Sequence, residues 1–146
     1  MENGAIVNHV GQCVADLDRS IRFYTELLGF EVDRTLELPD AAVSTLLSIE
    51  PPVGLRAVYL RRGEFQLELM QFDREGNPSF TERAFNEPGL THLSVCVEDL
   101  DDARARVADL GGAVVTDLGG VVMVRDPDGQ LLELLPMSFR SQRHSL

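Results

Sequence analysis

Residues 6–14 have the composition of a β-strand and show no apolar stripe at helical spacing. Because successive side chains of a strand point to opposite faces, His9 shares one face with Gly11 and Cys13, and valines occupy the other face. This alternation predicts a short strand that carries a histidine.

The next segment predicts a helix and then a second strand. Asp16 or Asp18 can cap the helix, because a short carboxylate accepts hydrogen bonds from the free amides of the first turn. Apolar residues then recur at three- and four-residue spacing, as in a helix that packs on a sheet: Leu17, Ile21, Tyr24 and Leu28. Gly29 is expected to end this helix, and residues 30–36 to start the second strand.

Residues 37–56 have a weaker pattern. Pro39-Asp40 is expected to open a short helix with an apolar side, and Pro51-Pro52 to stop it, because proline cannot continue a helix.

A hairpin and a linker complete the first half of the chain. Residues 57–60 and 65–70 are strand-like and flank a short polar turn that contains glycine. Residues 72–89 are polar and contain several glycines and prolines, which predicts a linker, with a helical turn around residues 81–85.

The second half repeats this order. A strand begins near Leu90, and the helix after it ends at Gly111-Gly112. Three further strands are predicted at residues 113–115, 121–124 and 130–135, with a strong turn signal in Asp126-Pro127-Asp128-Gly129. The residues after 136 have no pattern, and we expect a loose polar tail.

The two halves are copies of one unit. Placing His9 on His92 also aligns the whole segment Asn8–Asp18 with Thr91–Asp101. We therefore expect a single domain over residues 1–146, with both modules built as strand, helix and three strands: module 1 at about 5–72, a linker at 73–89, module 2 at 90–136 and a tail at 137–146.

The hairpin repeats with a shorter offset. Residues 57–60 align with 122–125, and Glu68 aligns with Glu133, at a smaller offset than the one that joins the two histidines, so the first copy is the longer one. The surplus falls in residues 37–56, where we expect a lid or an element that shapes the substrate site.

Charge and composition exclude several classes of partner. The formal charge of −11 argues against nucleic acid and against anionic membrane surfaces, but leaves room for an anionic small ligand in a locally positive pocket. No run approaches the roughly 18 apolar residues of a membrane span, and the N-terminus lacks the features of a signal peptide. Two cysteines in apolar contexts are typical of buried thiols in a reducing compartment, so we expect a cytoplasmic protein.

Four residues are selected by the repeat as candidate metal ligands: His9, Glu68, His92 and Glu133. Each is a polar residue in a largely apolar strand, and an uncompensated buried carboxylate costs several kcal/mol. Two carboxylates in equivalent places suggest one shared cation, and two imidazoles with two carboxylates suit a divalent metal that keeps positions open for substrate. A lone histidine or glutamate of this kind is more often structural, and it is the paired repeat that favours the metal site.

These residues and their surroundings resemble the vicinal oxygen chelate superfamily, which includes glyoxalase I, methylmalonyl-CoA epimerase, extradiol dioxygenases and bleomycin-resistance proteins. The resemblance covers about residues 5–136 and depends on His9-Val10 with Asp16-Leu17-Asp18, on Gly89–Ser94, and on Asp126–Gly129 with Leu132-Glu133-Leu134. It implies an α+β fold in which two βαβββ modules form a cupped mixed-sheet half-barrel around one metal.

The resemblance also implies a reaction class. The His-Glu-His-Glu set is similar to that of bacterial glyoxalase I, which favours nickel, cobalt, manganese or zinc over iron. We expect a metal-dependent lyase or isomerase that moves a proton on a metal-chelated small carbonyl substrate through an enediolate, with Glu133 or Glu68 as the base. Arg56, Arg61, Arg62 or Arg125 is a candidate to bind an anionic tail of the substrate.

Two other functions are compatible with the sequence. An iron(II) extradiol dioxygenase would need only His9, His92 and Glu133, and a drug-binding resistance protein would need no metal at all. The superfamily also implies a homodimer, in which the ligands meet either within one chain or across two.

Overall fold

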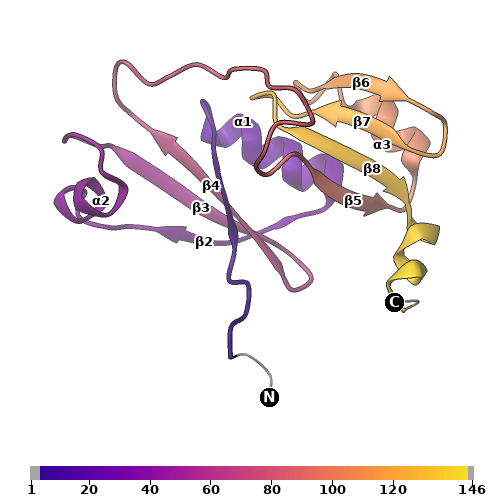
Figure 1. The fold of residues 1–146 in the computed structure, drawn as a ribbon, viewed down its shortest axis with the longest axis horizontal. Coiled ribbons are helices and arrows are strands. Elements are labelled where there is room, and N and C mark those ends of the chain that lie inside the picture. Colours follow the sequence, from indigo (N-terminus) through magenta and orange to yellow (C-terminus); the bar gives the residue numbers. More distant parts are fainter. Residues whose placement is uncertain (1–3, 145–146) are drawn as a thin grey trace. The chain divides into compact units, whose positions relative to one another are not determined.

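The computed structural model describes residues 4–144, with side chains described as far as residue 140. Within this part the chain is α+β, with two four-stranded mixed sheets and a few short helices (Figure 1). It divides into two compact units: one contains the described residues up to Leu17 together with Phe30–Asn77, and the other contains Asp18–Gly29 and the described residues from Pro78 onward.

The first unit is built on a sheet of order β1-β4-β3-β2. The strands are β1 (Val10–Cys13), β2 (Glu31–Leu36), β3 (Leu55–Arg62) and β4 (Phe65–Phe72). β1 runs parallel to β4, and the remaining pairs are antiparallel. Burial of Leu60, Leu67 and Leu69 gives this sheet its apolar core, because these side chains are at most 2% exposed.

The predicted helix in the insert is confirmed as α2 (Asp40–Leu47) in the first unit. Its Val43 is buried, and the Asp40 carboxylate accepts hydrogen bonds from the backbone amides of Val53 and Gly54 at 2.9–3.1 Å. These bonds, first from Gly54 and then from Val53, lower the pKa of Asp40. One side chain therefore ties the start of α2 to the chain that returns after it.

The second unit is built on a sheet of order β5-β8-β7-β6 with the same pairing pattern. Its strands are β5 (Leu93–Val97), β6 (Ala113–Asp117), β7 (Val122–Arg125) and β8 (Leu131–Pro136), and α3 (Leu100–Arg106) lies between β5 and β6 in sequence. Asp99 caps α3 by accepting a hydrogen bond from the amide of Asp102, as expected for a short carboxylate at this position.

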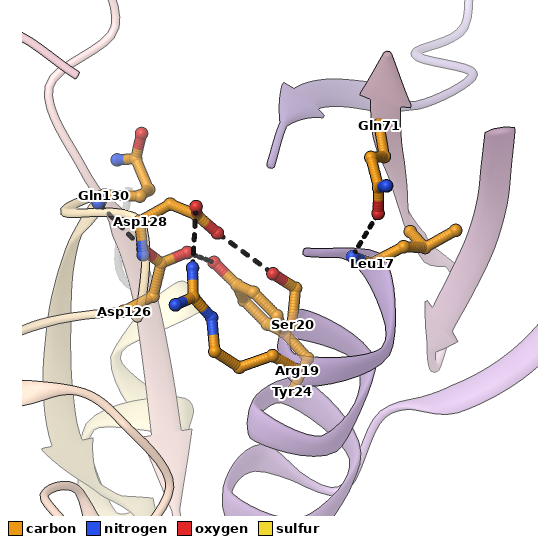
Figure 2. Close-up of polar contacts among 8 residues, drawn as sticks. All are labelled: Leu17, Arg19, Ser20, Tyr24, Gln71, Asp126, Asp128 and Gln130. Atoms are coloured by element: carbon orange, nitrogen blue, oxygen red, sulfur yellow. Dashed lines mark hydrogen bonds and ion pairs between the residues drawn. The ribbon is translucent and has the colours of Figure 1, made fainter. Parts of the chain in front are cut away.

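From Asp18 onward, the helix of the first repeat belongs to this second unit. It comprises α1 (Leu17–Arg22) and a π-helical continuation, η1 (Phe23–Leu27). In Figure 2 the Tyr24 hydroxyl donates to Asp126 at 2.9 Å, and Ser20 and Arg19 donate to Asp128 at 3.0 and 3.1 Å. The predicted turn Asp126–Gly129 is thus also an anchor for a helix that lies far earlier in the sequence.

Leu17, the first residue of α1, belongs to the first unit, and its amide bonds within that unit. It donates to the side-chain oxygen of Gln71 on β4 at 2.7 Å (Figure 2). The first amide of α1 is therefore satisfied by a distant amide side chain.

Both sheets repeat the same internal register, with one correction to the predicted alignment. Glu68 lies opposite Tyr59, and Glu133 lies opposite Met123. Tyr59 is therefore equivalent to Met123, and its predicted match with Val124 is wrong. The cause is the turn, because the second hairpin has one more residue between equivalent strand ends than the first.

Other local predictions were also wrong. His9 and His92 each lie one residue before their strands. Neither cysteine forms a disulfide, but Cys13 is exposed on the edge strand β1 and Cys96 is only half-buried. Residues 81–84 have no regular structure, and the turn in this segment lies slightly later, where the amide of Glu87 donates to the carbonyl of Ala84.

The tail was predicted to be loose, but it forms a 3-10 helix, η2 (Met137–His144), which contacts β5. Residues 145–146 lie outside the described part. Within residues 4–144, no helix has the length and apolar character needed to cross a membrane.

Candidate metal-binding site

In the first unit, His9 and Glu68 form a close pair. Nε2 of His9 lies 3.2 Å from Oε2 of Glu68, whose residue is only 7% exposed. Gly11 is the β1 neighbour of Glu68, and a Cβ there would lie 3.5 Å from the same carboxylate oxygen. The other ring nitrogen of His9, Nδ1, lies 2.6 Å from the side-chain oxygen of Asn8.

Tyr59 and Arg34 extend this pair across the sheet. Tyr59 lies opposite Glu68, donates a hydrogen bond to its carboxylate, and packs edge-on against the His9 ring at 5.2 Å. The Arg34 guanidinium lies 4.0 Å from the centre of the Tyr59 ring. Burial, and then the negative charge of Glu68, raises the pKa of Tyr59, so the hydroxyl stays protonated as a donor.

In the second unit, His92 and Glu133 form the equivalent pair. Nε2 of His92 lies 3.8 Å from Oε2 of Glu133, and the Ser94 hydroxyl donates to that oxygen at 2.7 Å. Nδ1 of His92 lies 2.9 Å from the Thr91 hydroxyl, and the imidazole packs against the Phe85 ring at 5.3 Å. Side chains of this pair are each 28% exposed, so this carboxylate is less buried than Glu68.

The geometry of the first pair fits a divalent metal, and the second pair is more widely spaced. In each pair Nδ1 is held by the preceding residue, which orients the ring and leaves Nε2 facing a carboxylate oxygen. A nitrogen and an oxygen that face each other with lone pairs need a proton or a cation between them. Ligands at about 2.1 Å from a metal lie about 3.0–3.4 Å apart for angles between 90° and tetrahedral. The His9–Glu68 separation of 3.2 Å lies in this range, whereas the His92–Glu133 separation of 3.8 Å lies outside it.

The structure thus brings the four predicted residues together as two pairs, one in each unit. Among residues 4–144 there is no group of three or more His, Cys, Asp and Glu side chains placed to hold a metal ion. The residues that orient each pair were not predicted from the sequence. Asn8 and Thr91 could have been identified, because they occupy equivalent positions in the repeat, directly before the two histidines. Tyr59 could not, because its position opposite Glu68 depends on the hairpin register.

A cavity of about 460 Å³ lies in the second unit, between the linker and the sheet. Met123 lines it and is the cross-strand neighbour of Glu133, so the cavity opens on the face of the sheet that carries this carboxylate. Linker residues that line it include Phe80, Glu82 and Phe85. Such a partly apolar cavity beside charged groups is typical of a small-molecule site.

Comparison with known proteins identifies the family. Residues 6–134 match the Glyoxalase/Bleomycin resistance protein/Dioxygenase superfamily. A probable lactoylglutathione lyase of Synechocystis sp. is 26% identical over 142 residues, covering 87% of this chain and 92% of the relative. A 2-epi-5-epi-valiolone epimerase of Actinomyces sp. is 33% identical over 105 residues, covering 68% of this chain and 56% of the relative.

A solved structure agrees with these relatives. The trypanothione-dependent glyoxalase I of Leishmania major superimposes with a TM-score of 0.69 at 27% identity, covering 96% of this chain and 92% of the other. The chain therefore belongs to the glyoxalase, bleomycin resistance protein and dioxygenase superfamily.

Proposed function

We propose that this protein is a metal-dependent enzyme that moves a proton at the carbon next to a carbonyl group of a small substrate. The observation that carries the proposal is the pair of equivalent His–Glu contacts, each with its imidazole held through Nδ1 and its Nε2 directed at a carboxylate. Relatives named as a lyase and as an epimerase support this class of reaction.

His9, Glu68, His92 and Glu133 would hold one divalent ion, with nickel, cobalt, manganese or zinc favoured over iron by the two-histidine, two-carboxylate set. When bound, such an ion acts as a Lewis acid that polarises a carbonyl and makes the neighbouring C–H more acidic. The Asn8 side-chain oxygen accepts from Nδ1 of His9 in the tautomer that leaves the Nε2 lone pair for a metal, and the Thr91 hydroxyl can accept from Nδ1 of His92 in the same tautomer.

The two glutamates are suited to different roles. Glu68 is buried and accepts a hydrogen bond from Tyr59, which suits a fixed ligand. Glu133 is more exposed, and its strand neighbour Met123 lines the cavity. A base must reach the substrate proton within hydrogen-bond distance, so Glu133 is the proposed base, with Ser94 positioning its carboxylate.

Proton exchange into solvent is the direct test. We expect the protein reconstituted with nickel or cobalt to exchange the proton beside the thioester carbonyl of S-lactoylglutathione for deuterium in D2O, followed by ¹H NMR. Glu133→Gln should reduce exchange by about 10²–10⁴-fold, the usual contribution of a general base. The matched control, Glu75→Gln, removes an exposed carboxylate from the linker and should leave exchange unchanged.

The alternatives predict different results. Oxygen uptake with a catechol, in place of proton exchange, would support an extradiol dioxygenase. Tight binding of an aromatic drug that persists after chelator treatment, with no exchange under any metal, would support a binding protein.

A further inference from the structure

Arg125 lies at the junction of the linker and the cavity wall in the second unit. One end of its guanidinium donates to the carbonyl of Gly129 at 2.8 Å, within the turn that follows β7. The other end donates to the Glu82 carboxylate at 2.6 Å. The Arg125 guanidinium is therefore bonded to this turn on one side and to a linker carboxylate on the other, beside the cavity that Arg125 and Glu82 both line.

The second bond is the exchangeable one. The Glu82 side chain is 75% exposed, while that of Arg125 is 26% exposed. Exposed ion pairs contribute only about 0–1 kcal/mol, so a competing anion in the cavity can replace Glu82 at little cost. The bond to Gly129 would keep the guanidinium in place during such an exchange.

Arg83 also lines the cavity, but its guanidinium is already hydrogen-bonded to backbone carbonyls. Its guanidinium donates to the carbonyls of Glu87, Pro88 and Leu90 at 2.7–3.2 Å, and so maintains the course of the linker. The Phe80 ring packs directly against Gly129 in the cavity wall, and a Cβ at Gly129 would lie only 2.8 Å from this ring. The linker thus contributes apolar walls and one removable carboxylate.

We propose that Arg125 binds a carboxylate of the substrate, and that Glu82 occupies this position until the substrate displaces it. The substrate of the proposed proton transfer, on which this inference depends, is then a small carbonyl compound with a carboxylate and an apolar portion that contacts Phe80 and Phe85. A local receptor of this kind is needed because the chain carries a formal charge of −11, which repels anions from most of its surface.

Arg61 is another of the arginines that the sequence offers for an anionic tail, but it does not line the cavity, so it provides a matched control. It occupies the position of Arg125 in the first repeat, because each arginine follows the residue opposite the strand glutamate, Tyr59 or Met123, at the same interval. Its side chain is 49% exposed, and its acidic partners Glu31 and Asp33 lie at 3.6 and 3.9 Å. Arg61→Gln therefore removes the same positive charge as Arg125→Gln, but at a residue that does not line the cavity.

The experiment is calorimetric titration of the full chain, as purified and after chelator treatment, with benzoylformate and with its uncharged methyl ester. Arg125→Gln should weaken benzoylformate binding by about tenfold or more, the value of a charge-assisted hydrogen bond, and leave the ester unaffected. Glu82→Gln should strengthen benzoylformate binding about two- to fivefold, because a weak competitor is removed. Arg61→Gln should change neither.

The proposal is overturned if the native protein does not prefer the acid, or if Glu82→Gln fails to bind benzoylformate more tightly. Glu82 is exposed, so that variant tests the proposal even if Arg125→Gln folds poorly. A preference for benzoylformate over its ester that depends on Arg125 and persists without metal would support the carboxylate site independently of the proposed function. The proposed function fails separately, if the chain takes up no metal or shows no proton exchange.

Discussion

At the scale of single residues, the two glutamates of the candidate site are held by different neighbours. Glu68 lies opposite a tyrosine and beside a glycine, whereas Glu133 lies opposite a methionine and accepts from the hydroxyl of Ser94. Equivalent positions in the repeat thus hold two different carboxylates. Glu68 is buried and accepts a hydrogen bond from the Tyr59 hydroxyl, whereas Glu133 is more exposed and accepts one from the Ser94 hydroxyl. This difference supports the proposed roles of Glu68 as a fixed metal ligand and Glu133 as the base, although the two residues occupy equivalent positions in the repeat.

Removing the Tyr59 hydroxyl should therefore weaken metal binding without removing a ligand. We expect Tyr59→Phe to lower metal affinity by about 10–100-fold, as for other groups that orient a ligand, measured by competition with a chromophoric chelator. Unchanged affinity would contradict the role given to Tyr59.

The other tyrosine should affect stability instead. Tyr24 donates to Asp126, which is 3% exposed, so Tyr24→Phe leaves a buried carboxylate oxygen without this donor. We expect a loss of about 1–3 kcal/mol in the free energy of unfolding, measured with urea, and no change in metal content. A variant as stable as the native protein would show that the bond adds nothing to the second unit.

At the scale of elements, the sequence predicted the helices and strands whose positions follow from local residue spacing. It did not predict the features that depend on contacts between residues far apart in the chain. The strands, α1, α3 and the insert helix α2 follow from local spacing and from breakers such as Pro51-Pro52. The π-helical end of α1 and the one-residue shift in the second hairpin depend on packing and turn length, which periodicity does not encode. The role of residues 37–56 as a lid stays a prediction.

Asp40 gives the insert a pH dependence with a defined sign. Its pKa in the folded state is lowered by the amides of Gly54 and Val53, so it stabilises the fold above its ordinary pKa of about 3.9, and this stabilisation is lost as pH falls through the lower folded value. Asp40→Asn should unfold more easily than the native protein at pH 7, and the two urea curves should converge below about pH 4. A difference that stays constant across this range would contradict the assignment.

At the scale of the whole molecule, the boundaries of the repeat differ from those of the compact units. The helix of the first repeat, residues 18–29, belongs with the second sheet, where Phe23 and Tyr24 are fully buried. Sequence similarity between halves revealed the duplication and the four candidate ligands, but it could not reveal this exchange, because both helices carry the same kind of apolar stripe.

A fragment of residues 78–146 should consequently fail to fold by itself, since it lacks the helix that buries Phe23 against Gly112. We expect little cooperative thermal unfolding by circular dichroism, and a gain of structure when a peptide of residues 17–30 is added. Cooperative unfolding of the fragment alone would show that the helix is dispensable.

The central claim is that two His–Glu pairs share one metal ion, and elemental analysis of the reconstituted protein tests it most directly. The native chain should hold about one divalent ion, as expected for a single site with four protein ligands. Glu68→Ala and His92→Ala, taken from different pairs, should each lose it, while Glu75→Ala should retain it. A native protein that stays metal-free, or a variant in one pair that keeps its full metal content, would contradict the shared site.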